Sequence, residues 1–569
     1  MREEERSYKH WLASCSAAEQ ALLCSLSEQE IREYFYADLE FGTAGMRGIL
    51  RLGRNGMNKY TVARATQGLA DYIKAQGQQK RGVVISYDSR HMSREFASVT
   101  AQILARNGIM VYLYDALRPV PLLSFGVRYY GAYAGVMITA SHNPKEYNGY
   151  KVYGEDGAQL APDSASEVQK LIERLDFFGI EAMQMQEAVA EGLVKIVGKE
   201  LDDAYMQAVL PLIRSKEAVA RKGAELSVVY TPIHGSGCKP VMRVLREMGM
   251  QKVELIAQQA EPDGDFSTVA SPNPENREAL ELAIARAKEI GATLVLGTDP
   301  DCDRMGAAVL NEQGEFVTLT GNQIACIMLS YLLEKCRQTG TLPQNGVVVK
   351  TIVSTELARA IANEYGAELV EVLTGFKFIG EKIKEYEQTG EHTFLFGFEE
   401  SYGYLEGTHA RDKDAVVACM LMCEAACSFA ERGKTVYQAL QELYEKYGYY
   451  TEKTVSYTLS GVEGMEKIAQ TMRMLAQRKT EEIGGVSVLA VRNYLTGVRR
   501  AADGNEQAIT LPKSNVLYYE LENNQWACVR PSGTEPKIKV YFGTCAKTRE
   551  AAQEALTTLE RGMKEIIAL

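Results

Sequence analysis

Short apolar runs separated by amphipathic stretches recur along most of this chain. Residues 82–86, 134–138 and 292–296 are apolar runs of strand length, and an amphipathic stretch at residues 60–76 has helical spacing. Continuous apolar runs of this length are typical of strands that a parallel sheet buries on both faces. Strands that alternate with helices predict βα units, and ligands bind such sheets at the carboxyl ends of the strands. The loops that follow the apolar runs are therefore the places to search for chemistry.

The same pattern repeats along the chain and then changes. Further short strands are predicted at residues 226–230, 346–349, 368–372 and 393–396, with helices at residues 412–432 and 435–446. From Tyr449 onward, antiparallel-looking strands mix with helices, which predicts a smaller α+β domain. Residues 1–40 and the polar region at residues 154–222 are predicted to be helical. A chain of 569 residues needs several hydrophobic cores, so it is predicted to form several domains.

The loop Thr139-Ala-Ser-His-Asn-Pro144 follows the apolar run at residues 134–138. Proline lacks an N–H and restricts the residue before it, so Asn143-Pro144 ends the strand and leaves Ser141 near the tip of the loop. A rigidly presented serine with His142 beside it is a candidate nucleophile or phosphoryl carrier. A plain polar loop is the alternative for an isolated Ser-His pair, and the other loops of the chain decide between the two.

Three aspartates alternate shortly after the apolar run at residues 292–296. In extended backbone Asp299, Asp301 and Asp303 would point to one side, and three adjacent carboxylates need a cation. Ligation by oxygen alone favours Mg²⁺ or Ca²⁺, but an EF-hand is rejected because Arg304 stands where that loop requires glycine. Three carboxylates leave room for a phosphate oxygen, as in Mg²⁺ sites of phosphoryl transfer, and Arg304 could neutralise the same phosphate. Solvated aspartates at a strand end are the alternative.

Two later loops offer groups that suit a sugar phosphate. Glu399-Glu-Ser401 supplies two acceptors and a hydroxyl for a polyol, although a helix N-cap with an acidic first turn is the favoured explanation of this motif alone. Arg530, Ser532 and Thr534 surround Gly533 in a turn before an alternating strand. Backbone N–H groups, two hydroxyls and a guanidinium in one turn can bind a phosphate.

Charge and cysteine content exclude several classes of partner. The net charge of −11 argues against nucleic-acid or anionic-membrane binding, and no apolar stretch is long enough to cross a membrane. The N-terminal residues are charged and lack an apolar signal segment, so a cytoplasmic location is expected. The 11 cysteines include no C-x-x-C pair. Cys419, Cys423 and Cys427 recur every four residues, which favours packing on a helix face over a metal site.

The serine, triple-aspartate, Glu-Glu-Ser and Arg-Pro-Ser-Gly-Thr loops, in this order, closely resemble those of the α-D-phosphohexomutase superfamily. The resemblance runs from about residue 41 to residue 541. It implies three related α/β domains and a smaller C-terminal α+β domain around a central cleft, which we place at residues 1–205, 206–321, 322–446 and 447–569.

The branch that this chain resembles most is that of the phosphoglucomutases, in the subgroup of longer bacterial enzymes and phosphopentomutase-like proteins. Glu400 stands where the phosphomannomutase/phosphoglucomutase branch typically has methionine. Gly375-Phe-Lys377 also resembles the glucomutase loop, although Phe376 replaces its usual tryptophan.

The resemblance also implies a role for each candidate residue. Ser141 would carry a phosphate in the active form, and that phosphate would share a Mg²⁺ ion with Asp299, Asp301 and Asp303. His142 and Arg304 would support the transferring phosphoryl group, while Lys151 and Arg47 would assist proton transfer and charge neutralisation. The remaining residues would bind the substrate, at the sugar hydroxyls or at the non-reacting phosphate: Lys377, Glu399, Ser401, Arg530, Ser532, Gly533 and Thr534.

The function expected from this resemblance is a phosphoglucomutase that interconverts α-D-glucose 1-phosphate and glucose 6-phosphate. The reaction would pass through a phosphoserine and a glucose 1,6-bisphosphate intermediate, with Mg²⁺ as cofactor. Phosphopentomutase, phosphomannomutase and glucose 1,6-bisphosphate synthase activities are alternatives on the same scaffold, and a sugar-phosphate-binding regulatory protein is the alternative outside the enzymes. The expected partners are small sugar phosphates, and the expected assembly is a monomer or a weak homodimer.

Overall fold

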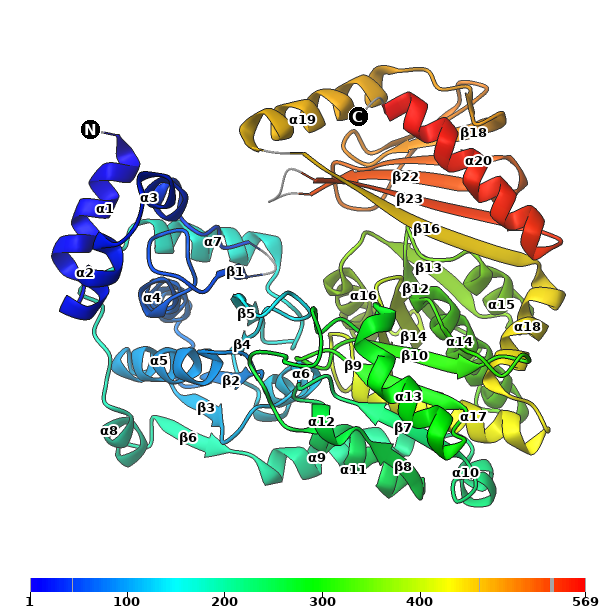
Figure 1. The fold of residues 1–569 in the computed structure, drawn as a ribbon, viewed down its shortest axis with the longest axis horizontal. Helices are drawn as coiled ribbons and strands as arrows, with labels where there is room; N and C mark the ends of the chain where they lie inside the picture. The colour runs from blue at the N-terminus through cyan, green and yellow to red at the C-terminus, as the bar shows by residue number, and fades with distance from the viewer. Residues whose placement is uncertain (1, 43–44, 460, 533–536, 568–569) are drawn as a thin grey trace. The chain divides into compact units, whose positions relative to one another are not determined.

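The computed structural model of the protein describes residues 2–42, 45–459, 461–532 and 537–567 (Figure 1). Contacts divide the chain into two compact units. The first unit contains Met1–Ile324 and Ile379–Val436, and the second contains Ala325–Phe378 and Tyr437–Leu569. Among the described residues, no helix combines the length and the apolar character that crossing a membrane requires.

The first sheet of the first unit has the strand order β1-β5-β4-β2-β3-β6. Its strands are β1 (Met46–Ile49), β2 (Val83–Tyr87), β3 (Val111–Tyr114), β4 (Ala134–Ile138), β5 (Tyr147–Tyr153) and β6 (Val194–Val197). The four strands from β4 to β6 are parallel, and β5 and β1 are antiparallel additions at one edge. The predicted βα units are therefore present, and Ser141 follows the carboxyl end of β4.

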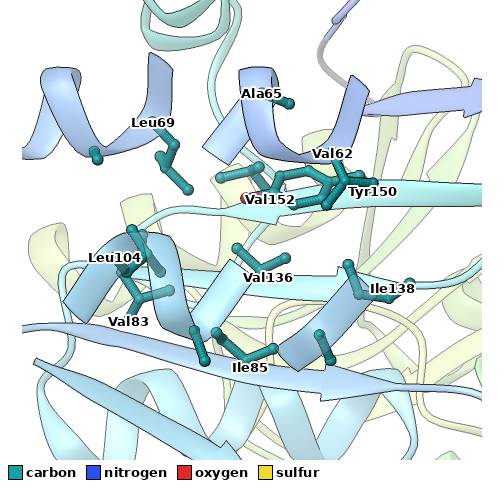
Figure 2. Close-up of a cluster of buried hydrophobic side chains, with 14 of the residues drawn as sticks. Val62, Ala65, Leu69, Val83, Ile85, Leu104, Val136, Ile138, Tyr150 and Val152 are labelled. Atoms are coloured by element: carbon teal, nitrogen blue, oxygen red, sulfur yellow. The ribbon is translucent and has the colours of Figure 1, made fainter. Parts of the chain in front are cut away.

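Helices pack on this sheet and supply part of its core. They are α4 (Lys59–Ala75), α5 (Ser93–Arg106), α6 (Val120–Tyr130), α7 (Pro162–Glu173), α8 (Met185–Ala190) and α9 (Lys199–Val209). A 3₁₀ turn at Leu210–Leu212 and α10 (Lys216–Lys222) then lead to the second sheet. Figure 2 shows Leu69 of α4, Leu104 of α5 and Val136 of β4 in one buried cluster. Burying one such side chain stabilises the fold by about 1.5–3 kcal/mol. The amphipathic stretch predicted at residues 60–76 forms α4.

The N-terminal region predicted as helix is divided into three helices, α1 (Glu3–Ser14), α2 (Ala17–Cys24) and α3 (Glu28–Phe35). Serines divide them: Ser16 caps α2 and Ser27 caps α3, each accepting from the backbone N–H of the glutamate three residues on. Such capping boxes satisfy N–H groups that a helix start leaves without partners. Trp11 and Phe35 anchor the three helices in an aromatic cluster with Phe177 and Phe178.

The prediction that residues 154–222 are all helical is wrong at β6. This strand lies at the edge of the first sheet, next to β3. Only Val194 of its four residues is buried, while Lys195 and Ile196 are exposed. An edge strand with so few buried positions lacks the apolar run that identifies an interior strand.

The second sheet of the first unit has the order β11-β10-β9-β7-β8. Its strands are β7 (Ser227–Thr231), β8 (Lys252–Leu255), β9 (Leu294–Thr298), β10 (Met305–Leu310) and β11 (Phe316–Thr318). The helices here are α11 (Cys238–Met248), α12 (Ala257–Ala260) and α13 (Glu281–Ile290), with a 3₁₀ turn at Arg277–Leu280. β7 is parallel to both β8 and β9, so the aspartate loop after β9 again follows the carboxyl end of a parallel strand.

The first unit also contains the hairpin of β14 (Thr393–Glu399) and β15 (Gly403–Glu406), followed by α17 (Ala415–Glu431). Nearly every residue of α17 is buried, including Cys419, Cys423 and Cys427. The three thiols therefore pack in the core, and the one cluster of metal-ligand side chains found among the described residues is the aspartate triad. The helices α14 (Gly321–Gln338), α16 (Phe376–Thr389) and α18 (Val436–Tyr447) contribute residues to both units.

The second unit combines one βα pair with an antiparallel sheet. β12 (Gly346–Thr351) and β13 (Glu368–Val372) are parallel and joined through α15 (Leu357–Tyr365). α18 leads to the antiparallel sheet, whose order is β16-β23-β22-β21-β18-β19-β20 with β17 paired to β18. The α+β region predicted from Tyr449 onward is confirmed in this sheet.

The strands of this antiparallel sheet are β16 (Tyr449–Thr458), β17 (Glu482–Ile483), β18 (Val486–Asn493), β19 (Val498–Ala501), β20 (Glu506–Ala508), β21 (Leu517–Leu521), β22 (Trp526–Pro531) and β23 (Lys537–Ala546). Two long helices, α19 (Gly461–Gln477) and α20 (Arg549–Ile567), accompany them, with a 3₁₀ turn at Glu522–Asn524. Figure 1 shows α20, in red, lying across β23 and β16.

Candidate active site

Ser141 lies at the start of the loop after β4, in backbone that L-residues rarely adopt. Its φ is 53°, in the left-handed region, which costs roughly 1–2 kcal/mol for a residue with a side chain. Its backbone N–H donates to Thr139 Oγ1 at 2.8 Å. The side chain is buried, and its hydroxyl donates to Asp299 Oδ2 at 3.0 Å. His142 Nδ1 lies 3.2 Å from the same hydroxyl. The serine and the aspartate loop therefore share one site.

The aspartate loop is a tight turn rather than the extended segment that the alternating carboxylates predicted. The Cys302 backbone N–H donates to Asp299 O at 2.9 Å, and Cys302 has a φ of 50°. Asp299 Oδ1 accepts the backbone N–H groups of Asp303 and Arg304 at 3.1 and 3.0 Å. The turn brings one oxygen of each aspartate within 4.8 Å of the others. The three carboxylates are neighbours, as predicted, but a turn brings them together and extended backbone does not.

The triad has oxygens available for a cation. Asp301 Oδ1 and Asp303 Oδ1 are buried and have no hydrogen-bond partner among the described residues. A buried carboxylate oxygen without a donor is costly, and a hard divalent cation is the partner that suits these two oxygens and the neighbouring Asp299 carboxylate best. The donor set therefore fits an oxygen-ligated metal ion.

Electrostatics within the triad lead to the same conclusion. Burial, together with the charges of Asp301 and Asp303, raises the pKa of Asp299 well above its ordinary value. Burial and the charge of Asp301 also raise the pKa of Asp303. Burial works in the same direction at Asp301, but the nearby Lys151 ammonium outweighs it and the pKa is lowered. Three buried carboxylates at this spacing resist full ionisation without an added positive charge.

Two lysines contact the triad from different elements. Lys151 of β5 lies 2.8 Å from Asp301 Oδ2 and 3.8 Å from Asp303 Oδ2. Because Lys151 pairs with Met137 of β4, the sheet register carries it beside the serine strand. Lys413 lies 3.1 Å from Asp303 Oδ2 and 2.9 Å from Asp412 Oδ1.

Sequence reasoning missed Lys413. Burial alone would lower its pKa, but the carboxylates of Asp303 and Asp412 outweigh that effect and raise it. The available signal was the charged run Arg411-Asp-Lys-Asp414 directly before the apolar helix α17. Buried charges in such a run are uncommon unless they are paired, so the run marks a site.

Two arginines, Arg304 and Arg47, lie near His142. Arg304 Nη1 donates to Glu275 Oε1 at 2.6 Å, and Arg47 Nη1 donates to Asn143 Oδ1 at 2.9 Å. Desolvation, assisted by both guanidinium groups, lowers the pKa of His142 well below its ordinary value. At neutral pH the imidazole is therefore uncharged and can accept or donate one hydrogen bond at each nitrogen.

Glu399 and Ser401 lie where β14 turns into β15, and this turn adjoins the aspartate loop. Arg304 forms an isolated bridge with Gly403, and the Met305 N–H donates to Tyr402 O at 3.1 Å. Glu399 is buried and is one of the acidic neighbours that raise the pKa of Arg304. The hairpin therefore places a carboxylate and a hydroxyl next to the triad.

The glycine-rich turn Thr231-Pro-Ile-His-Gly-Ser-Gly237, which follows β7, supports the aspartate loop from behind. The Ser236 N–H and Oγ each donate to Pro300 O at 2.8 Å. Gly235 lies so close to Pro300 that a Cβ on it would meet Pro300 Cα at 2.5 Å. A second support comes from α6, where the Val120 N–H donates to Asp301 O at 2.9 Å.

The predicted phosphate loop and Lys377 belong to the second unit. Arg530 lies near the end of β22, and the Ser532 N–H donates to Lys537 O at 2.7 Å. Gly533 and Thr534 lie outside the described residues. Lys377 lies near the start of α16, with its ammonium over the Phe378 ring at 4.8 Å.

Four family models match the chain, in the order of the predicted domains. They are the Phosphoglucomutase/phosphomannomutase alpha/beta/alpha domains I, II and III, at residues 38–178, 203–313 and 320–447, and the C-terminal domain at residues 476–560. The phosphoglucomutase of Staphylococcus haemolyticus is 40% identical over 509 residues, which cover 89% of this chain and 90% of that protein.

Solved structures share the fold. A Thermus thermophilus structure described as a phosphomannomutase has a TM-score of 0.68 at 21% identity, over 94% of this chain and 100% of that one. The open form of the Paramecium phosphoprotein pp63/parafusin, a phosphoglucomutase, has a TM-score of 0.67 at 16% identity, over 94% of this chain and 96% of that one. These matches, with the four domain models and the relative that is 40% identical, show that the chain belongs to the phosphoglucomutase/phosphomannomutase family and has the four-domain phosphohexomutase architecture expected from its sequence.

Proposed function

We propose that the protein is a phosphoglucomutase that interconverts α-D-glucose 1-phosphate and glucose 6-phosphate. The observation that carries the proposal is the 3.0 Å contact between the Ser141 hydroxyl and Asp299, in a buried triad that two lysines also contact. The relative of S. haemolyticus that is 40% identical is a phosphoglucomutase, and its name agrees with this assignment.

In the proposed reaction, phospho-Ser141 gives its phosphoryl group to the 6-hydroxyl of glucose 1-phosphate. The bond from phosphorus to Ser141 Oγ breaks, a bond to the sugar O6 forms, and the 6-hydroxyl proton passes by way of a neighbouring base to Ser141 Oγ. The product, glucose 1,6-bisphosphate, then turns in the site so that its 1-phosphate faces Ser141. Transfer of that phosphoryl group back to Ser141 releases glucose 6-phosphate and restores the phosphoenzyme. In the second transfer the Ser141 proton passes to the sugar O1 in the same way. Atoms balance over the cycle, and no other reactant is needed.

Charge stabilisation and positioning dominate phosphoryl transfer. We assign the metal to Asp299, Asp301 and Asp303, with the Ser141 phosphate as a further ligand; when bound, Mg²⁺ would neutralise charge that develops on the transferring group. Lys151 lies where it can move a proton or neutralise charge, and Lys413 joins it in that role because both lysines contact the Asp303 carboxylate.

The reaction also requires that the site recognise the sugar in two orientations, with either phosphate-bearing end facing Ser141. His142 and Arg304 would contact the transferring phosphoryl group, and Arg47 would neutralise charge beside the serine loop. We assign the sugar hydroxyls to Glu399 and Ser401, whose turn adjoins the aspartate loop. The non-reacting phosphate and the rest of the substrate are assigned to Lys377, Arg530, Ser532, Gly533 and Thr534.

Several finer predictions from the sequence belong to this proposal. They are the choice of Mg²⁺, the activating role of glucose 1,6-bisphosphate, sugar phosphates as the partners, the cytoplasmic location and the monomeric or weakly dimeric state. The four domain boundaries at residues 1–205, 206–321, 322–446 and 447–569 stay a prediction as well.

The decisive experiment compares the wild type with Ser141→Ala. Intact-mass spectrometry of the wild type after incubation with glucose 1,6-bisphosphate and Mg²⁺ should show a species about 80 Da heavier, the mass of one phosphoryl group. Ser141→Ala should lack that species and turnover, while its unfolding transition stays near the wild-type value. The control is Ser164→Ala, which removes a serine hydroxyl of the same domain, on α7, that accepts the Tyr72 hydroxyl at 3.2 Å.

Phosphoryl uptake by Ser141→Ala at the wild-type level would overturn the assignment of the carrier. A panel of glucose 1-phosphate, mannose 1-phosphate and ribose 1-phosphate then tests the sugar. A kcat/KM that is highest for mannose or ribose 1-phosphate would replace the phosphoglucomutase assignment by a phosphomannomutase or phosphopentomutase one.

A further inference from the structure

Arg90, which follows β2, has its whole guanidinium group turned toward the main chain of the serine loop. Its side chain is fully buried. Nη2 donates to Ser141 O and Asn143 O, both at 2.5 Å. Nη1 donates to Pro144 O at 2.8 Å and to Tyr147 O at 3.1 Å. One side chain thus binds four carbonyl oxygens spread over the loop that carries the predicted phosphoryl acceptor.

A second set of contacts fixes Arg90 itself. Asp88 Oδ1 accepts the Arg90 backbone N–H at 2.9 Å and the Ser93 hydroxyl at 2.7 Å. Asp88 Oδ2 lies 3.2 Å from Arg90 Nε and accepts the Thr139 hydroxyl at 2.6 Å. Thr139 Oγ1 in turn accepts the Ser141 N–H at 2.8 Å. The contacts form a closed circuit that joins the carboxyl end of β2 to the carboxyl end of β4.

The loop at residues 261–276, which joins α12 to the 3₁₀ turn at Arg277–Leu280, covers one face of the Arg90 guanidinium. The Phe266 ring lies under Arg90 at 5.0 Å from its centre, and Phe266 is buried with a φ of 48°. Ser271 of the same loop donates its hydroxyl to His142 O at 3.2 Å. Water therefore has little access to the bonds between Arg90 and the loop, which makes them stronger than exposed bonds of the same length.

The geometry requires arginine and not merely a positive charge. A guanidinium offers five N–H donors in a fixed plane, whereas a lysine ammonium is a single point with three rotating donors. The carbonyls of Ser141, Asn143, Pro144 and Tyr147 are spread too widely for one ammonium to reach them all. Ser141 also needs this support most, because its left-handed backbone is unfavourable without it.

We infer that Arg90 is a positioning residue for phosphoryl transfer, and this inference rests on the function proposed above. In the contacts described, Arg90 touches neither the Ser141 hydroxyl nor the carboxylate oxygens of Asp299, Asp301 and Asp303. Through the loop carbonyls it keeps the Ser141 hydroxyl at hydrogen-bond distance from Asp299. Its loss should therefore slow transfer to and from Ser141, and it should leave recognition of the sugar and of the second phosphate unchanged.

The test compares Arg90→Lys with the wild type and with Arg64→Lys. Arg64 is a suitable control because it is also a buried arginine of the first domain, donating to Leu175 O at 2.9 Å and to Asp38 Oδ2 at 2.6 Å, away from the serine loop. Arg90→Lys should lower kcat and the rate of phosphoryl uptake from glucose 1,6-bisphosphate about 100-fold, since displacing a reacting group by about 1 Å has that effect. Its KM for glucose 1-phosphate should stay within about twofold of the wild type, and Arg64→Lys should show neither change.

Hydrogen exchange provides a readout that does not depend on turnover. In Arg90→Lys, amide exchange should become faster in residues 139–149 and stay unchanged in the peptide that contains the aspartate turn. A kcat and an uptake rate within about threefold of the wild type would overturn the inference. So would a fall in kcat accompanied by a rise of KM in the same proportion, because that pattern indicates lost substrate binding.

A second variant covers the case in which Arg90→Lys does not fold. Thr139→Val removes the hydroxyl that joins Asp88 to the Ser141 N–H and leaves Arg90 in place. It should slow phosphoryl uptake about tenfold, as expected for a smaller displacement, without changing KM. Uptake at the wild-type rate would again overturn the inference. Failure of the proposed function is distinguishable, because then the wild type itself would take up no phosphoryl group.

Discussion

A single methyl group behind the aspartate turn gives the sharpest test of how the site is built. Gly235 is not in the left-handed region, so alanine suits its backbone. The new Cβ, however, would lie 2.5 Å from Pro300 Cα, 2.8 Å from Pro300 O and 3.0 Å from Asp299 O. These are main-chain atoms that cannot rotate away. Gly235→Ala must therefore push the aspartate turn toward the site.

The size of the push follows from the contacts. Ordinary van der Waals contact begins at 3.4 Å, so Pro300 and the glycine-rich turn must separate by about 0.9 Å. Pro300 lies between two of the predicted metal ligands, and these would move with it. A displacement of about 1 Å lowers the rate of positioned chemistry by about 100-fold, and overpacking costs about 1–3 kcal/mol of folding stability. We expect Gly235→Ala to show both effects.

The measurements are kcat as a function of Mg²⁺ concentration and urea unfolding of the same preparation. Gly154→Ala is the matched control, because its Cβ would meet Asp156 Oδ1 at 3.4 Å and Ala158 O at 4.0 Å, which are ordinary contacts. This control should change the unfolding free energy by no more than about 0.5 kcal/mol. A Gly235→Ala enzyme with kcat within about twofold of the wild type and an unchanged Mg²⁺ requirement would refute the argument.

Three further outcomes are expected. Asp301→Asn should lower kcat at least about 100-fold and remove the dependence of kcat on Mg²⁺. The control Asp163→Asn, on the exposed face of α7, should show neither effect. If Asp301→Asn responded to Mg²⁺ as the wild type does, the metal assignment would be contradicted. Burial and the nearby Glu424 carboxylate, opposed by Arg214, raise the pKa of Glu406 from 4.5 to about 7. Between these two pH values the folded state holds a proton that the unfolded state has lost. The unfolding free energy should therefore fall by about 3 kcal/mol as pH rises from 4.5 to 7. Glu406→Gln should flatten that slope in urea unfolding, and an unchanged slope would rule out this residue as its source. Arg530→Ala should raise KM for glucose 1-phosphate by the equivalent of roughly 1.5–3 kcal/mol, and an unchanged KM would exclude it from phosphate binding.

The sequence predicted the parts of the site whose signals are local. Apolar runs ended by glycine or proline located β4 and β9, and the loops at the carboxyl ends of these strands were the places to search for chemistry. The two strands lie in different sheets, so only the resemblance to a family indicated that the serine and the aspartates share one site. Capping serines, by contrast, were overlooked in residues 1–40, where they divide one predicted helix into three. The edge strand β6 was missed because only one of its residues is buried.

Contacts between distant segments could not be predicted from pattern alone. Lys413 reaches Asp303 only because the β14–β15 hairpin and the turn after β9 pack together, which no local periodicity reveals. The four carbonyl partners of Arg90 depend on the conformation of a loop far along the chain. The glycines of the Thr231–Gly237 turn leave room for the backbone of the aspartate turn, and this close approach exists only in the folded chain.

The serine and aspartate turns are attached to the rest of the protein through backbone oxygens. Arg90 binds Ser141 O, the Ser236 N–H binds Pro300 O, and the Val120 N–H binds Asp301 O. Every amino acid presents the same carbonyl, so these attachments do not depend on which side chain the turn carries. Single substitutions of the reacting side chain should therefore leave these backbone contacts in place. Ser141→Cys, for example, would introduce a thiol as the phosphoryl carrier without a redesign of the surrounding loop.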